Sequence, residues 1–182
     1  MCGRYEFNIL ADSKGKQIKE QVKKLNLVFK EGEIFCGDKV LCVIPKESKI
    51  DLSVMKWGIQ TKSLLINARS ETLKDKPTFK RIMNRRCAVI CNGFYEWDKN
   101  KNKFYINFKD KYMYLACIFN ELNELVILTQ EANDEDFKKI HNRIPIIMNQ
   151  EEMINYVHGF GSKITNKDLF INNVKEDIKL FK

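Results

Sequence analysis

Four apolar segments separated by short polar connections constrain the fold of this chain most strongly. They run from Cys87 to Trp97, Phe104 to Phe108, Tyr112 to Phe119 and Glu124 to Thr129. The connections between them are only a few residues long, which is the length of β-hairpin turns. The sequence therefore predicts an antiparallel meander.

Helices are predicted on both sides of this region. Apolar residues recur at helical spacing within residues 18–25, which predicts an amphipathic helix that covers a core. Ser70 could cap a helix that begins at Glu71, but Pro77 is a favourable first helical residue and predicts a start there instead, with the helix running towards Asn84. Two more helices are expected over residues 133–140 and 149–156, and further strands over residues 4–9, 32–45, 50–58, 146–148 and 170–174.

Length and charge limit the class of protein. The 182 residues suffice for one sizeable core, and no linker divides them. The 32 Lys and Arg residues against 24 Asp and Glu give a formal charge of +8, which favours anionic partners such as nucleic acid. No apolar run approaches the ~20 residues that span a bilayer, and no signal peptide is present, so we expect a cytoplasmic protein.

The six cysteines do not indicate a metal site. Their positions, 2, 36, 42, 87, 91 and 117, do not reproduce the paired spacing of zinc ligands. In a reducing compartment they are expected to stay free. Core positions are predicted for Cys87, Cys91 and Cys117, are favoured for Cys36 and Cys42, and are also predicted for Trp57.

The N-terminal segment Met1-Cys2-Gly3-Arg4-Tyr5 carries a possible nucleophile. Removal of Met1 gives Cys2 a thiol and a free α-amine on adjacent carbons, and an amine with a pKa of about 7.7–8.0 is partly neutral at physiological pH. Such a 1,2-aminothiol captures aldehydes: the amine forms an imine, and the thiol closes a five-membered thiazolidine. The alternative is a chance Cys in a mobile terminus.

Asn67 and Arg69 follow an apolar run and stand two residues apart, so in an extended segment their side chains share a face. The alternative, a strand end followed by a helix cap, is compatible with this. Glu96 lies between Tyr95 and Trp97 at the end of a buried strand, where desolvation would raise its pKa towards the range useful for proton transfer. An exposed Glu at a strand end is the competing interpretation.

His141 ends the helix predicted over residues 133–140. The negative end of a helix dipole favours the imidazolium form, so the sequence predicts a charged His141 that could donate a proton. A surface or capping role is the alternative.

Taken together, Met1–Tyr5, Asn67–Thr72, Gly93–Trp97 and His141–Pro145 resemble the SRAP family, the SOS response-associated peptidase proteins. The resemblance implies a single α+β domain over residues 1–182, with a curved, partly barrel-like antiparallel β-sheet and peripheral helices. The motifs occupy residues 1–148, and residues 149–182 are expected to be a peripheral C-terminal part. The implied function is to shield abasic sites in single-stranded DNA in the response to DNA damage.

Residue roles follow by motif from this resemblance. It implies that Cys2 is the nucleophile that forms a thiazolidine with the ring-opened deoxyribose aldehyde, that Asn67 orients the sugar, that Glu96 relays protons, and that His141 assists ring opening and crosslink reversal. The implied contacts to the DNA backbone are Arg4, Arg69, Arg143 and, more weakly, Lys80. The implied partner is single-stranded DNA with abasic sites, without cofactor, metal or membrane, and we expect a monomer that is nucleoid-associated when bound.

The chain departs from the family pattern in two places. Between Gly58 and Leu64 the family usually has a longer loop with a Pro and a Trp that wedges against bases, whereas only residues 59–63 remain here. Base stacking is worth roughly 1–3 kcal/mol per base, so we expect weaker DNA affinity or a different preferred junction, with the covalent chemistry unchanged. Asn142 stands where the family commonly has Asp.

Two other functions stay open. An N-terminal-nucleophile peptidase would use Cys2, Glu96 and His141 to cleave a peptide bond. A non-covalent binder of single-stranded nucleic acid would rely on its basic residues alone. A covalent product with abasic DNA would separate the first function from both alternatives.

Overall fold

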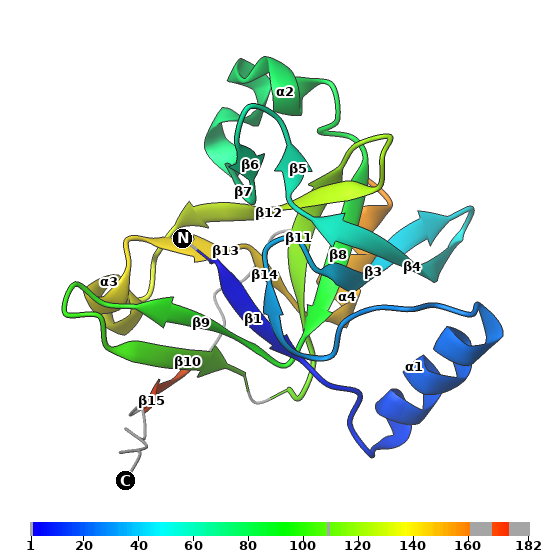
Figure 1. Cartoon of the computed structure of the whole chain (residues 1–182), viewed down its shortest axis with the longest axis horizontal. Coiled ribbons are helices and arrows are strands. Elements are labelled where there is room, and N and C mark those ends of the chain that lie inside the picture. The colour runs from blue at the N-terminus through cyan, green and yellow to red at the C-terminus, as the bar shows by residue number, and fades with distance from the viewer. Residues whose placement is uncertain (1, 109, 161–168, 175–182) are drawn as a thin grey trace, which may run out of the picture.

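Two β-sheets make up most of the computed structural model, which describes residues 2–108, 110–160 and 169–174 (Figure 1). The larger sheet has the strand order β13-β12-β4-β3-β8-β11-β14, and β7 pairs with β12 beside this path. Because β12 also pairs with β11, the strands from β12 through β4, β3, β8 and β11 form a closed ring. Its strands are β3 (Lys39–Lys46), β4 (Lys49–Trp57), β7 (Asn67–Arg69), β8 (Arg86–Cys91), β11 (Met113–Phe119), β12 (Glu124–Glu131), β13 (Arg143–Pro145) and β14 (Ile147–Met148).

The smaller sheet has five strands in the order β15-β10-β9-β1-β2. They are β1 (Arg4–Phe7), β2 (Gly32–Phe35), β9 (Gly93–Trp97), β10 (Lys103–Asn107) and β15 (Phe170–Val174), all paired in antiparallel fashion. The predicted α+β fold with a curved, partly barrel-like sheet is confirmed. Two pairings in the larger sheet, of β12 with β4 and with β7, are parallel.

The predicted four-strand meander is wrong in two places. Its first segment, residues 87–97, divides into β8 in the larger sheet and β9 in the smaller one. Hairpins join β9 to β10 and β11 to β12 as expected. However, β10 belongs to the smaller sheet, whereas β11 pairs with β8, β12 and β14 in the larger one. The connection between β10 and β11 therefore carries the chain from one sheet to the other, which a short polar segment permits as readily as a hairpin.

Three of the described helices begin at side-chain caps. In α1 (Ser13–Lys24), Asp12 accepts a hydrogen bond from the backbone N–H of Gly15 (2.8 Å). In α3 (Glu135–Ile140), Asp134 accepts a hydrogen bond from the backbone N–H of Phe137 (2.7 Å). In α4 (Gln150–Val157), Asn149 and Glu152 form a reciprocal capping box. The α4 helix packs on the larger sheet and buries Met153 completely, so this part of the C-terminal region is less peripheral than predicted.

The segment after β7 is less helical than predicted. Residues Ser70–Asp75 form a 3₁₀ helix, η1, and its capping position, Arg69, makes no side-chain cap, so Ser70 is not the predicted cap. Pro77 begins α2 as expected, but α2 ends at Lys80, well before Asn84. The remaining helix, α3, runs from Glu135 to Ile140, close to the predicted range.

The core lies inside the ring and between the two sheets. Trp57 is fully buried, packs 5.3 Å from Tyr5 between ring centroids, and donates its indole N–H to the carbonyl of Ile66 (3.0 Å). Its predicted core position is therefore confirmed, as are those of Cys87, Cys91 and Cys117, while Cys42 is also buried and Cys36 is half-buried.

The shortened segment after Gly58 forms a small hairpin of β5 (Ile59–Gln60) and β6 (Leu64–Leu65), joined by residues 61–63. Gly58 adopts a φ of +120°, and a Cβ there would lie 2.7 Å from Leu64. Within the part of the chain that the structure describes, no helix is long and apolar enough to cross a membrane.

Candidate active site

Cys2 lies two residues before the first residue of β1, Arg4, and is fully buried. Asn67 holds it, because its Nδ2 donates a hydrogen bond to the carbonyl oxygen of Cys2 (2.8 Å). Burial raises the pKa of the Cys2 thiol, and the nearby carboxylate of Glu96 raises this pKa further. At neutral pH, Cys2 is therefore a thiol rather than a thiolate, so a proton must leave its sulfur when it acts as a nucleophile.

Asn67 is the first residue of β7, which β12 holds in place through parallel pairing with residues 127–129. Its side-chain oxygen, Oδ1, is buried and has no hydrogen-bond partner among the described residues. A buried acceptor without a donor is costly, so Oδ1 is suited to accept a hydrogen bond from a ligand hydroxyl. Arg69, two residues later on the same strand, is exposed.

Glu96 is 4% exposed on β9. Side chains alternate along a strand, so Phe94 and Glu96 face the core while Tyr95 and Trp97 lie on the opposite face. Burial raises the pKa of the Glu96 carboxyl, as predicted. The cause differs from the prediction, because the desolvation comes from the core side and not from the two flanking aromatic rings.

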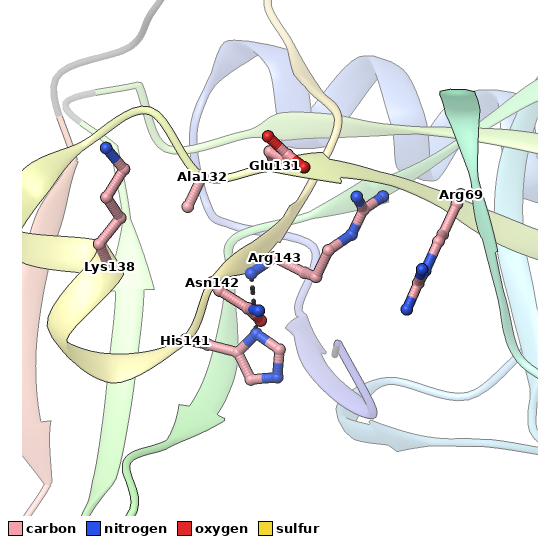
Figure 2. Close-up of a pocket in the computed structure, with 7 residues that line it drawn as sticks. All are labelled: Arg69, Glu131, Ala132, Lys138, His141, Asn142 and Arg143. Atoms are coloured by element: carbon pink, nitrogen blue, oxygen red, sulfur yellow. Dashed lines mark hydrogen bonds between the residues drawn. The ribbon is translucent and has the colours of Figure 1, made fainter. Parts of the chain in front are cut away.

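His141 is the C-terminal cap of α3 and has extended backbone angles. Its ring Nδ1 accepts a hydrogen bond from the backbone N–H of Arg143 (2.9 Å), drawn as a dashed line in Figure 2. A ring nitrogen that accepts a hydrogen bond carries no proton, so the imidazole is neutral and its proton is on Nε2. Burial also lowers the pKa of His141. The predicted imidazolium form is therefore wrong, because burial, the largest cause of the lowered pKa, favours the neutral ring.

A pocket of about 490 Å³ opens beside His141 (Figure 2). The pocket is lined by three Lys and Arg side chains, which differ in their ion-pair partners. Lys138 is paired with Glu135 (2.6 Å) and Arg143 with Glu71, whereas Arg69 has no ion-pair partner among the described residues. The pocket is lined by Arg69, Glu131, Ala132, Lys138, His141, Asn142 and Arg143.

The predicted site residues thus fall into two neighbouring groups. Cys2 is hydrogen-bonded to Asn67 and lies within electrostatic range of Glu96. His141 and Arg69 share the pocket, and β7 carries both Asn67 and Arg69. Among the described residues, no cluster of three or more His, Cys, Asp or Glu side chains could hold a metal ion.

A family model described as "SOS response associated peptidase (SRAP)" matches residues 1–180. The chain belongs to the SRAP family. The abasic site processing proteins YoqW and YoaM of Bacillus subtilis (strain 168) are 28% and 27% identical to it; the alignments cover 85% and 81% of this chain and 80% and 75% of those proteins. The abasic site processing protein HMCES of Gallus gallus is 26% identical over 62% of this chain and 43% of that protein.

Solved structures share the SRAP fold seen here. A protein from Bacteroides thetaiotaomicron superposes with a TM-score of 0.75 at 19% identity and covers 97% of this chain and 93% of its own. A protein from Bordetella bronchiseptica gives a TM-score of 0.71 at 16% identity, with 96% and 100% coverage. At these identities the likeness establishes the fold alone.

The other predicted DNA contacts of this SRAP protein have different surroundings. Arg4 forms an ion pair with Glu33 (3.2 Å) and lies over the rings of Phe35 and Trp97, at 4.5 and 4.9 Å from their centroids. Lys80 is exposed at the end of α2 and does not line the pocket beside His141.

Arg143 differs most from its predicted position along DNA. It is 8% exposed, and its guanidinium binds both carboxylate oxygens of Glu71, each at 2.9 Å. Both residues lie in the SRAP motifs, and their opposite charges are a sequence signal for the ion pair. The parallel placement of β7 beside β12, which helps to bring them together, is seen only in the structure.

Proposed function

We propose that this SRAP protein processes abasic sites in single-stranded DNA by covalent capture of the ring-opened deoxyribose at Cys2, once Met1 has been removed. The observation that carries the proposal is the arrangement around Cys2. Asn67 donates a hydrogen bond to the carbonyl oxygen of Cys2, and the buried carboxyl group of Glu96 lies within electrostatic range of the Cys2 thiol. The names of the curated relatives, abasic site processing proteins, agree with it.

The first bond forms between the Cys2 amine and the aldehyde carbon. The nitrogen lone pair attacks, and a proton passes from this nitrogen to the former carbonyl oxygen to give a carbinolamine. Loss of its hydroxyl as water requires a proton donor, and a carboxyl group whose pKa is raised by burial is suited to this step. Glu96 therefore donates the proton and is left as a carboxylate.

The second bond closes the ring. Loss of water leaves a protonated imine; the Cys2 sulfur adds to its carbon, and its nitrogen keeps this proton and becomes the ring amine. Because the buried thiol is protonated, its proton must be transferred as the carbon–sulfur bond forms. Glu96, now a carboxylate, accepts it and so returns to its starting state. The products are a thiazolidine and one water molecule.

His141 and Asn67 act on the sugar in this proposal. A neutral His141 has its proton on Nε2 and donates a hydrogen bond to the ring oxygen as the sugar opens. The unpartnered Oδ1 of Asn67 accepts a hydrogen bond from a sugar hydroxyl. Arg69 binds a flanking phosphate from the rim of the pocket.

The decisive experiment is to incubate the purified protein with a single-stranded oligonucleotide that carries one abasic site, followed by denaturing electrophoresis and mass spectrometry. We expect a stable adduct whose mass is that of protein plus DNA minus one water. Cys2→Ala should abolish it and leave at most a reversible imine. Cys36→Ala, which removes the half-buried thiol near Gly3, is the matched control and should crosslink normally. A stable adduct in Cys2→Ala would refute the mechanism.

The same experiment separates the two alternatives. A non-covalent binder would shift the DNA in a native gel without a denaturation-resistant adduct. A peptidase, the activity that the family is named for, would release peptide fragments from a protein substrate and would not require an aldehyde. Mass spectrometry of the mature N-terminus checks the remaining requirement, since a retained Met1 blocks the aminothiol.

A further inference from the structure

We propose that Glu71 and Arg143 form a positioning pair that fixes the orientation and tautomer of the His141 ring, and that Arg143 does not contact DNA phosphate. Both residues act on the reaction through His141 and are not themselves catalytic. The consequence for crosslinking rests on the proposed function, whereas the effect on the His141 ring does not.

The guanidinium of Arg143 has four hydrogen-bond acceptors within reach. Nη1 and Nη2 donate to Oε1 and Oε2 of Glu71, both at 2.9 Å, which is the bidentate geometry of a strong ion pair. Nη2 also donates to the carbonyl oxygen of Thr129 (2.7 Å) and to its hydroxyl (3.1 Å). Only one Nη1 hydrogen and the buried Nε–H remain without a partner among the described residues, so this anchored group offers a phosphate fewer accessible donors than the exposed Arg69 does.

The ion pair joins segments that lie far apart in the sequence. Glu71 is in η1, directly after the strand that carries Asn67 and Arg69. Arg143 begins β13, directly after His141 and Asn142. Both contact β12, because the backbone N–H of Glu131 donates to Glu71 (3.3 Å) and Glu131 is paired with Arg143 in the sheet. The pair therefore ties the two groups of site residues together across β12.

The ion pair acts on the His141 ring through the backbone N–H of Arg143. The N–H of Arg143 donates to Nδ1 of His141 (2.9 Å), so the position of this N–H selects the nitrogen that stays unprotonated. A side chain anchored by Glu71 and Thr129 keeps the Arg143 backbone in place. Figure 2 shows the arrangement, with the Arg143 side chain directed away from His141 and its backbone nitrogen directed at the ring.

Glu71 remains ionised at neutral pH. The hydrogen bonds from Arg143 lower the pKa of its carboxyl group. Replacing Glu71 with Gln removes this charge with little change in shape, and thus weakens the anchor without emptying the site. Arg69, which lines the same pocket but is exposed, provides the comparison for a true phosphate contact.

The first test measures the His141 tautomer by ¹⁵N NMR in the absence of DNA. The chain has only two histidines, so His158→Gln assigns the signals. We expect the Nε2–H form in the wild type and a shift of the tautomer ratio by about two- to tenfold in Glu71→Gln, the effect of losing one ordinary hydrogen bond. Glu135→Gln, which breaks the exposed pair with Lys138, is the matched control and should leave the ring unchanged.

A milder variant tests the proposal if Glu71→Gln does not fold. Thr129→Val keeps Glu71 and the bidentate pair but removes one acceptor of the Arg143 guanidinium, and we expect a smaller shift in the same direction. A wild-type tautomer ratio in folded Glu71→Gln or Thr129→Val would overturn the proposal. Because no DNA is present, failure of the crosslinking function has no influence on this result.

The second test asks whether Arg143 binds phosphate. The affinity for undamaged single-stranded DNA is measured over a range of salt concentrations in Arg69→Ala and Arg143→Gln. Arg69→Ala should reduce the salt slope by about 0.7, the value for one phosphate contact, and Arg143→Gln should leave the slope unchanged. An equal reduction in both variants would overturn the proposal.

Discussion

Cys2 and Glu96 are two buried acidic groups, and the charge of an ionised Glu96 disfavours ionisation of the Cys2 thiol. Burial raises the pKa of both groups, so both hold their protons at pH values where they would be ionised in water. This is unfavourable for a thiolate nucleophile but suitable for a reaction that needs a proton donor first and a proton acceptor later. The Cys2 amine, rather than its thiol, therefore begins the proposed reaction.

The raised pKa of Glu96 predicts a specific dependence of stability on pH. A carboxyl group whose pKa is higher in the folded than in the unfolded protein stabilises the fold at low pH, and this contribution is lost as the pH rises through the folded pKa. Glu96→Gln should therefore match the wild type at low pH and be more stable at pH 7, each kcal/mol corresponding to about 2–4 °C in the melting temperature.

Thermal unfolding at a series of pH values measures this difference. Glu135→Gln, at an exposed position, should show no such trend. The same Glu96→Gln variant should crosslink abasic DNA about 10²–10⁴ times more slowly, since it lacks the proton relay. A Glu96→Gln variant less stable than the wild type at every pH would contradict the desolvation argument.

The neutral state of His141 leads to a second prediction at the residue scale. A neutral imidazole contributes a hydrogen bond from Nε2, which the side-chain amide of Gln can partly replace, whereas a proton transfer cannot be replaced in this way. His141→Gln should therefore crosslink faster than His141→Ala. Both should approach the wild-type rate on an acyclic aldehyde analogue, because ring opening is then not needed.

Time courses with an abasic site and with the acyclic aldehyde, in the same DNA sequence, measure these rates. Identical slow rates of His141→Gln and His141→Ala on the abasic site would indicate proton transfer instead. Equal slowing on both substrates would remove ring opening from the role of His141.

Single residues also show how far the sequence could predict the site. Cys2, Asn67 and Glu96 stand in local motifs, so their chemistry could be proposed without a structure. The pairing of Glu71 with Arg143 depends on η1 and β13 meeting across β12, a contact between residues 72 positions apart. The protonation state of His141 could not be predicted either, because it depends on the position of one backbone N–H.

At the scale of elements, β9 connects the site to the smaller sheet. It carries Glu96 on its core face and packs Gly93 beneath the ring of Tyr105 on β10. A Cβ at Gly93 would lie 2.4 Å from Cζ of Tyr105, well inside any normal contact distance. Gly93 is therefore required by close packing, and not by a left-handed backbone conformation.

This packing predicts that Gly93→Ala destabilises the protein by about 1–3 kcal/mol, the usual cost of overpacking. Tyr105→Ala should remove the collision, so the double variant should be more stable than the sum of the two single effects predicts. Denaturant unfolding of the four proteins completes the cycle. Strictly additive effects would show that the contact between β9 and β10 is not responsible.

Element boundaries followed the sequence where the apolar pattern was regular, as in β11 and α4. Element boundaries could not be predicted where the apolar pattern was short and weak. Pro77 set the start of α2 correctly, but nothing in the sequence marked its end at Lys80. The assignment of β10 and β11 to different sheets also escaped prediction, because strand alternation does not identify a strand's partner.

At the scale of the whole molecule, the positive charge is spread over regions that the proposed site does not use. The α1 helix carries exposed lysines at positions 16, 19, 23 and 24. Figure 1 shows α1 on the opposite side of the molecule from the marked N-terminus and β13. Net charge alone therefore does not identify the DNA-binding surface. That surface has to be identified from which cationic side chains lack an ion-pair partner and lie near the site.

Two variants, each of which removes one positive charge, distinguish DNA binding by the pocket from DNA attraction by the net charge of the protein. Arg69→Ala and Lys19→Ala both lower the formal charge from +8 by one. Arg69 lines the pocket and has no ion-pair partner among the described residues, whereas Lys19 lies on α1. If each neutralised phosphate contributes about 0.7 to the salt slope, Arg69→Ala should lower the slope by about that amount and Lys19→Ala should leave it unchanged. Fluorescence anisotropy with undamaged single-stranded DNA over a range of salt concentrations measures both slopes, and equal changes would mean that binding follows the charge of the whole molecule.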